Sequence, residues 1–292
     1  MKRENIESAL RSSSTRKMLS LVSAMSATGL VTAPSPRVIM KFGGSSVRDA
    51  ERITEVCKLV VNQMEESGVR PHLVCSAMGK TTNNLLAATE RAIDEQVVDL
   101  SAVRDLHQET AVTLGLVESA EYADVLQLLD ECERTLEGVS LLGELSARTR
   151  DRVVSYGERC SGRMVAACLN GLGVPSQQIE SWDLGLTTCS TFGDASVLDA
   201  CWPDIKKNVA AIPTEPWTVG VITGFIGKDV SGSITTLGRG STAGFKCLPA
   251  LTMLARAAYR KSRGASPHSE LQPGLPSGPR RRRAARLGSQ PS

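Results

Sequence analysis

The chain has 292 residues, of which 41% are hydrophobic, 22% charged and 3% aromatic. This length allows one large or two modest domains. No apolar run approaches the roughly 18 residues of a membrane-spanning helix. The net charge is +3, but residues 244–292 hold ten basic residues against one acid and residues 1–37 hold six against two, so residues 38–243 carry −10. An acidic central region argues against a nucleic-acid-binding fold.

Residues 1–36 are rich in Ser, Arg and Thr and weakly amphipathic. This composition resembles an organelle transit peptide, although Glu4 and Glu7 are unusual in one. The alternative is an N-terminal segment without fixed structure. Import into an organelle is therefore one expectation, and a cytoplasmic location is the other.

From residue 37 the pattern is that of strands followed by helices. Residues 37–42 form a short apolar run closed by glycines, which predicts a strand and a turn. Ser46 is the predicted N-cap of a helix over 48–64, residues 71–76 predict a second strand, and residues 81–95 a second helix. This repeated order predicts a parallel sheet with helices on its faces.

Residues 99–170 have a helical pattern almost throughout. The segments 99–114 and 118–136 predict one antiparallel pair of helices. A longer helix is predicted over 144–170, with a break near Ser155–Gly157.

The remaining chain divides into a strand-forming part and a tail. Residues 176–181 predict a short strand, 217–225 form the most β-like run, and 226–237 predict a hairpin. Residues 244–292 are mostly Arg, Pro, Gly, Ser and Ala, a composition that cannot bury enough apolar surface to fold. We expect a solvated basic tail, with nucleic-acid contact as the weaker alternative.

The eight cysteines and three histidines show no C-x-x-C or other metal-ligand spacing, so we predict no metal site. Most of the cysteines lie in apolar helix or strand patterns. They are expected to be buried free thiols in a reducing compartment.

Residues 41–46 (KFGGSS) place Lys41 at a strand end before two glycines and two hydroxyls. Gly43 and Gly44 would let backbone N–H groups approach phosphate oxygens closely, and the following helix N-terminus adds favourable dipole charge. Lys41 could then neutralise charge on a transferred phosphoryl group. Taken alone, the same turn is more often a tight strand–helix connection.

Two other glycine motifs do not fit known nucleotide-binding patterns. Residues 79–82 (GKTT) would end a Walker A motif only if glycine stood at position 74, where the chain has Val74. Gly171 and Gly173 follow a helix, and Ser176 stands in the place of the third glycine of a dinucleotide fingerprint. Any phosphate site is therefore of another kind.

Two motifs place a charged side chain near glycine. Glu158 and Ser161 lie three residues apart at a predicted helix start, where an acid can serve the helix dipole or bind a substrate. Arg239 follows the predicted hairpin in a glycine turn. Its guanidinium fork suits a carboxylate, whereas a turn arginine is usually solvated. Spacing alone leaves both questions open.

Five segments, in this order, carry a family resemblance over about residues 37–243: 41–47 (KFGGSSV), 76–86 (SAMGKTTNNLL), 157–163 (GERCSGR), 223–228 (TGFIGK) and 235–240 (TTLGRG). Together they resemble the aspartate kinase family in its plant-type, monofunctional, lysine-sensitive form. The resemblance implies the amino-acid kinase fold, a three-layer α/β/α sandwich around a mainly parallel sheet. It also implies a plastid location.

The family's reaction moves the γ-phosphoryl group of ATP, with Mg²⁺ as part of the co-substrate and no tightly bound cofactor, to the β-carboxylate of L-aspartate. The reaction leads to lysine, threonine, methionine and isoleucine, and the family's subunits are expected to form homo-oligomers. By resemblance, four residues would hold the phosphates, with Lys41 catalytic: Lys41, Gly43, Gly44 and Ser45. Three would hold L-aspartate: Thr82 its α-carboxylate, Glu158 its α-ammonium and Arg239 a carboxylate.

The resemblance fails after Arg239. The family continues Gly-Arg-Gly-Gly-Ser-Asp, whereas this chain reads Gly240, Ser241, Thr242, and Glu270 is the one acid that follows. We expect the fold to be incomplete on its C-terminal side, without the family's adenine-binding strands and ACT domains. The alternatives are an impaired fragment that binds aspartate or pairs with full-length subunits, and another member of the amino-acid kinase family.

Overall fold

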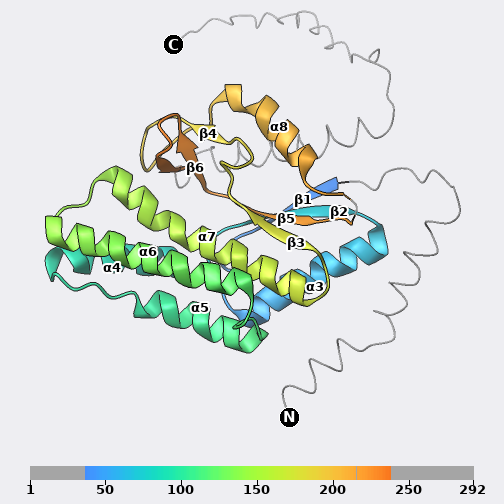
Figure 1. Cartoon of the computed structure of the whole chain (residues 1–292), viewed down its shortest axis with the longest axis horizontal. Helices are drawn as coiled ribbons and strands as arrows, with labels where there is room; N and C mark the ends of the chain where they lie inside the picture. Colours follow the sequence, from blue (N-terminus) through green and yellow to red (C-terminus); the bar gives the residue numbers. More distant parts are fainter. Residues whose placement is uncertain (1–36, 215, 238–292) are drawn as a thin grey trace, which may run out of the picture.

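The computed structural model of the protein describes residues 37–214 and 216–237. Its centre is a four-stranded parallel sheet with the order β1-β2-β5-β3 (Figure 1). These strands are β1 (Arg37–Phe42), β2 (Arg70–Cys75), β5 (Val219–Thr223) and β3 (Ser176–Ile179). A smaller sheet joins β4 (Thr187–Thr188), β6 (Ile226–Asp229) and β7 (Ile234–Thr236), and β6 and β7 form the predicted hairpin.

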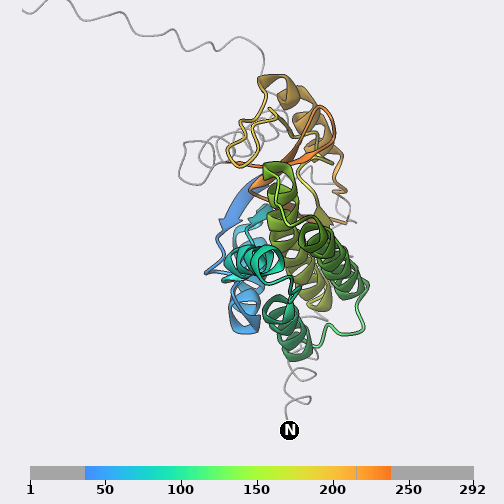
Figure 2. The same cartoon turned by 90° about the vertical axis from the view of Figure 1, so that its left-hand side faces the viewer.

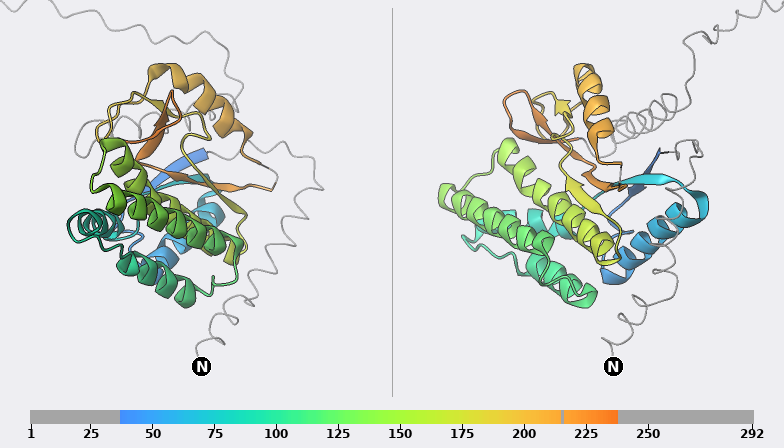
Figure 3. Two further views of the ribbon diagram at one scale, coloured as in Figure 1. Left: turned by 60° about the vertical axis from the view of Figure 1, so that its left-hand side comes forward. Right: turned by 45° about the vertical axis from the view of Figure 1, so that its right-hand side comes forward.

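Helices cover both faces of the parallel sheet, which confirms the predicted α/β fold (Figures 1 and 2). One face carries α3 (Ala50–Ser67), α4 (Thr81–Asp94), α5 (Ser101–Leu114), α6 (Ala120–Leu142) and α7 (Ala147–Gly171). The other face carries α8 (Trp202–Ala211), preceded by a short 3₁₀ turn, and the smaller sheet (Figure 3). Residues 238–292 lie outside the described part of the chain, so the expected incomplete C-terminal side stays a prediction.

The alternation of side chains along the strands creates two cores. Successive residues of a strand point to opposite faces of the sheet. Leu73 and Cys75 of β2 therefore pack with the five helices, whereas Val74 packs on the other side with Ile222 of β5 and Ile205 of α8. All five side chains are at most 2% exposed, so the sheet is covered on both faces, as parallel sheets require.

The start of α3 differs from the prediction. Asp49, and not Ser46, is the N-cap, because its carboxylate accepts the N–H of Arg52 at 2.9 Å. Ser46 belongs to the glycine turn instead, where its own N–H donates to the carbonyl of Gly43 at 2.9 Å. The turn is thus three residues longer than the sequence pattern indicated.

The predicted break in the long helix near Ser155–Gly157 is wrong, because α7 continues through this segment. The Ser155 hydroxyl donates to the carbonyl of Arg152 within the helix at 2.6 Å. Gly157 serves close packing, since a Cβ atom there would lie 2.9 Å from the Cβ of Ala77. Glu158 consequently lies about three turns inside the helix and not at its start.

The predicted antiparallel pair of helices, 99–114 and 118–136, exists as α5 and α6. The apolar stripe of α6 packs most extensively against α7 and then against α4. Arg104 of α5 reaches α6 through Asp130 at 2.7 Å and Glu133 at 2.5 Å. The strand β4 and the helix α8 were not predicted from the sequence.

Six cysteines are buried free thiols, as predicted, and Cys189 is only half-buried: the six are Cys57, Cys75, Cys132, Cys160, Cys168 and Cys201. Cys247 lies outside the described residues. Across residues 37–214 and 216–237, no helix combines the length and apolar character needed to span a bilayer.

The substitution Gly157→Ala tests the close approach of α7 to the turn after β2. Its methyl group would overlap Ala77, so we expect the free energy of unfolding to fall by about 1–3 kcal/mol. Gly138 of α6 has open space at its Cβ position, and Gly138→Ala is the matched control, expected to raise the free energy of unfolding by about 0.5–1 kcal/mol. Urea unfolding followed by circular dichroism measures both, and equal effects would contradict the close approach.

Candidate active site

The carboxyl ends of three parallel strands meet at one edge of the sheet. Phe42 of β1 pairs with Cys75 of β2, which pairs with Thr223 of β5. The segments after these strands, 43–46, 76–80 and 224–225, are therefore neighbouring turns. Open α/β sheets bind their ligands at this kind of edge.

The glycine turn after β1 is fastened to the turn after β2. The N–H of Ser76 donates to the carbonyl of Phe42 at 3.1 Å, and the N–H of Gly79 donates to the carbonyl of Gly44 at 3.0 Å. A Cβ atom at Gly44 would lie 2.7 Å from the carbonyl oxygen of Ala77. Only glycine fits at position 44, so the second glycine of the motif is required by the close packing of the two turns.

Glu158 reaches this edge from the middle of α7. Its Oε2 atom accepts the N–H groups of Gly224 at 3.0 Å and Phe225 at 2.8 Å, and the residue is only 5% exposed. A Cβ atom at Gly224 would lie 2.7 Å from the Cγ1 atom of Val74, so this turn also requires glycine. No hydrogen bond from the described part of the chain reaches Oε1 of Glu158.

The electrostatics of Glu158 reflect its burial. Burial raises the pKa of its carboxyl to about 7, although the N–H groups of Phe225 and Gly224 and the ammonium of Lys41 act to lower it. The attraction from Lys41 means that the lysine at the end of β1 is close enough to the Glu158 carboxyl to act on its pKa.

A cavity of about 870 Å³ opens above this edge. Its lining includes Gly44, Thr82 and Glu158, three of the residues that the sequence predicted for a site. Gly43 and Ser45 belong to the same turn as Gly44, but Ser45 lines a separate depression of about 440 Å³. Lys41 is not among the lining residues and acts on Glu158 only through the attraction between their charges, and Arg239 lies outside the described residues.

The sequence analysis missed Asp151, which also lines the cavity. Asp151 is 2% exposed, and its Oδ2 atom accepts the N–H groups of Gly193 at 2.9 Å and Thr236 at 2.8 Å. Its Oδ1 atom accepts the Thr236 hydroxyl at 2.8 Å. The one signal in the sequence was its position seven residues before Glu158, which places both acids on the same face of a helix.

The acidic side chains of the cavity do not form a metal site of their own. Within residues 37–214 and 216–237, no three His, Cys, Asp or Glu side chains gather as ligands for a metal ion. The cavity instead holds two buried acids, Asp151 and Glu158, and Lys41 lies near enough to act on the pKa of Glu158. Such a site can bind a small molecule that carries both an amino group and anionic groups.

The fold is an amino-acid kinase fold, as shown by the parallel sheet, its glycine turns and its edge cavity. The chain belongs to the amino acid kinase family, whose sequence model matches residues 36–244. It is 40% identical over 211 residues to Aspartokinase 1, chloroplastic, from Arabidopsis thaliana, covering 70% of this chain and 36% of that protein. It is 32% identical over 226 residues to an aspartokinase of Schizosaccharomyces pombe, covering 70% of this chain and 41% of that one. The chain thus spans less than half the length of either relative.

The fold is also similar to that of Escherichia coli aspartokinase III, whose crystal structure contains aspartate and ADP. The TM-score is 0.62 at 25% sequence identity, and the match covers 75% of this chain and 46% of that one. These similarities confirm the resemblance to aspartate kinases on which the sequence analysis relied.

The pH dependence of stability tests the buried state of Glu158. The folded pKa of about 7 exceeds the ordinary value of 4.5, so the folded protein binds this proton more tightly than the unfolded chain does. The stabilisation that comes from this proton is fully present below pH 4.5 and is lost as the pH rises through 7. The free energy of unfolding therefore falls by about 3 kcal/mol over this range.

We expect Glu158→Gln to abolish this decline, since glutamine still accepts the two N–H groups but does not ionise. Urea unfolding from pH 4.5 to 8 measures the difference between the two proteins. The exposed Glu137→Gln on α6 is the control and should follow the wild-type curve. A Glu158→Gln curve parallel to wild type would show that Glu158 titrates at an ordinary pKa.

Proposed function

We propose that the protein is an aspartate kinase, which transfers the γ-phosphoryl group of ATP to the β-carboxylate of L-aspartate and forms 4-phospho-L-aspartate. The observation that carries this proposal is the buried Glu158 carboxylate, whose Oε1 atom is left for a ligand in a cavity that Thr82 also lines. The similarity to aspartokinases, one of them crystallised with aspartate and ADP, supports the choice of substrates.

Glu158 and Thr82 would hold the amino-acid end of the substrate. The α-ammonium of aspartate would pair with Glu158, where water is excluded and the attraction between opposite charges is strong. This pairing would also offset the cost of burying the carboxylate and keep it ionised. Thr82 would donate a hydrogen bond to the α-carboxylate, and Arg239 would bind a substrate carboxylate.

Lys41 and the glycine turn would hold the phosphates of the Mg²⁺–ATP co-substrate. A Cβ atom at Gly43 would meet nothing within 4 Å, so the turn has open space for phosphate oxygens beside its backbone. Gly44 and Ser45 would add backbone N–H groups, and Lys41 would neutralise charge that develops on the transferred group. Catalysis would consist of positioning and charge neutralisation, without a covalent enzyme intermediate.

The alternative is a protein that binds aspartate without transferring phosphate. The sequence feature that favours it is the segment Gly240–Thr242, which lacks the aspartate found there in the family. A role in the synthesis of lysine, threonine, methionine and isoleucine, a plastid location and a homo-oligomeric state belong to the same proposal. The chloroplastic relatives support the location.

The substitutions Glu158→Gln and Lys41→Met separate binding of aspartate from chemistry. We expect Glu158→Gln to raise the dissociation constant for aspartate about 100-fold, or roughly 3 kcal/mol, because the partner of the ammonium is lost. Lys41→Met should leave this constant within about twofold and lower kcat by about 100-fold, since the lysine acts on the phosphoryl group. Calorimetry measures binding, and trapping of the acyl phosphate with hydroxylamine measures kcat.

The exposed Lys58 of α3 provides the control Lys58→Met, which should match the wild-type protein in both assays. Aspartate binding without hydroxamate formation in the wild-type chain would establish the alternative. Unchanged aspartate affinity in Glu158→Gln would refute the assigned role of Glu158.

A further inference from the structure

A second cavity of about 550 Å³ lies against another face of α7 and shares no lining residue with the first. Four cationic side chains line it, Arg148, Arg152 and Arg159 from α7 and Lys228 from β6. One acid, Glu131 of α6, lies among them. This basic cavity is unexpected in a region of the sequence that carries a net charge of −10.

Three of the four cations form no close ion pair, although Glu131 attracts Arg152 and Asp183 attracts Lys228 from a longer distance. Arg159 is paired with Glu180 at 3.2 Å. For Arg148, Arg152 and Lys228, no ion pair forms with any acid in the described ranges. Counting Glu180 against Arg159, and Glu131 against the other three cations, leaves the lining side chains with a net charge of +2.

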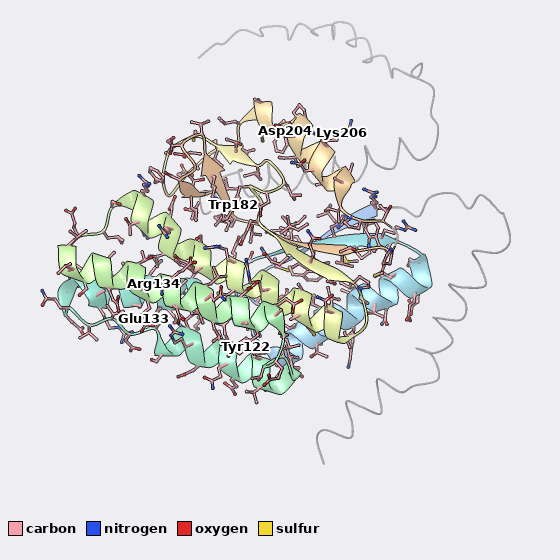
Figure 4. All side chains as sticks on the ribbon, viewed as in Figure 1. Tyr122, Glu133, Arg134, Trp182, Asp204 and Lys206 are labelled. Atoms are coloured by element: carbon pink, nitrogen blue, oxygen red, sulfur yellow. The ribbon has the colours of Figure 1, made fainter. Side chains whose placement is uncertain are left out.

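Trp182 forms an aromatic wall beside these charges. The ammonium of Lys228 lies 4.5 Å from the centroid of its ring, and the guanidinium of Arg159 lies 5.9 Å from it. Figure 4 shows Trp182 between α7 and the smaller sheet. Lys228 is half-buried here and has only a longer-range attraction to Asp183, and a partly desolvated cation without a close ion pair favours the approach of an anion.

The first turn of α7 adds hydrogen-bonding groups to the same cavity. Ser146, the N-cap, and Thr149 both line it. Ser146 already accepts the N–H of Thr149 at 3.1 Å, but the start of this 25-residue helix still carries partial positive charge, which favours an anion.

We propose that this basic cavity binds the phosphoryl group of a small phosphorylated molecule. A phosphoryl group carries about −1.5 to −2 charges at neutral pH, which matches the net charge of the cavity. Arginine forks and a lysine point charge are the side chains that bind phosphate most effectively. The site is separate from the candidate active site, and the inference does not depend on the proposed kinase activity.

Titration with inorganic phosphate at constant ionic strength, followed by tryptophan fluorescence, tests this proposal. We expect a saturable change that disappears in Trp182→Phe, because Trp182 is the tryptophan in the cavity. In Arg148→Gln/Arg152→Gln the phosphate concentration at half-saturation should rise at least about tenfold. Both arginines are exposed, so this double variant should keep the fold, which circular dichroism verifies.

Two further proteins separate the basic cavity from other cationic sites. Arg134→Gln removes an exposed arginine of α6 outside the cavity and should bind phosphate like the wild type (Figure 4). Lys41→Met removes the lysine of the candidate active site and should keep the Trp182 signal. Absence of a saturable signal, or an unchanged half-saturation in the double variant, would overturn the proposal.

Discussion

A carboxylate taken out of water must be given hydrogen-bond donors, and Glu158 receives them from the backbone of the turn after β5. This requirement fixes much of the surrounding structure. Position 224 must be glycine, because a side chain there would collide with Val74 of β2. Position 157 must be small, because α7 has to approach Ala77 closely enough for its acid to reach the sheet edge. One buried charge thus explains two glycines that are distant in sequence.

Asp151 extends this arrangement to the smaller sheet. Two turns before Glu158 on α7, it accepts hydrogen bonds from Gly193 and from both the backbone and the hydroxyl of Thr236. Two buried acids on one helix face therefore hold three separate backbone segments: the turn after β5, the turn at Gly193 and the end of β7. Because β7 leads directly to residue 238 and then to Arg239, Asp151 fixes the point from which that segment departs. We regard Asp151 as a residue that positions the cavity wall.

Local sequence patterns were sufficient where the structure depends on neighbouring residues. The strands β1 and β2, the hairpin of β6 and β7, and the glycine turn with Lys41 follow from apolar runs and glycines within a few positions. The break predicted in α7 was wrong because Gly157 does not end the helix. It is needed for close packing against Ala77, which is remote in sequence. Asp151 was missed for the same reason, since its partner Thr236 is 85 residues away.

The identity of Glu158 as a site residue came from resemblance, because spacing alone could not separate it from an acid at a helix start. Its partners are 66 and 67 residues away, so its environment becomes apparent only in three dimensions. The basic cavity went unpredicted because its cations come from α7 and β6, which are remote in sequence, and because the acids of α7 face the other cavity, so that only the fold brings these cations together.

The two cavities are built from adjacent residues of the same elements. Asp151 and Glu158 face the first cavity, and the next residue in each case, Arg152 and Arg159, faces the second. The hairpin divides similarly, with Thr236 on one side and Lys228 on the other. An anion that draws Lys228 toward α7 would act on the strand pair that Asp151 holds through Thr236. Such an anion can change the affinity of the first cavity for its ligand only if the hairpin has two positions, with Lys228 nearer to or farther from α7, and the anion binds one of them more tightly than the other. The shared helix and hairpin supply the physical connection that this coupling requires.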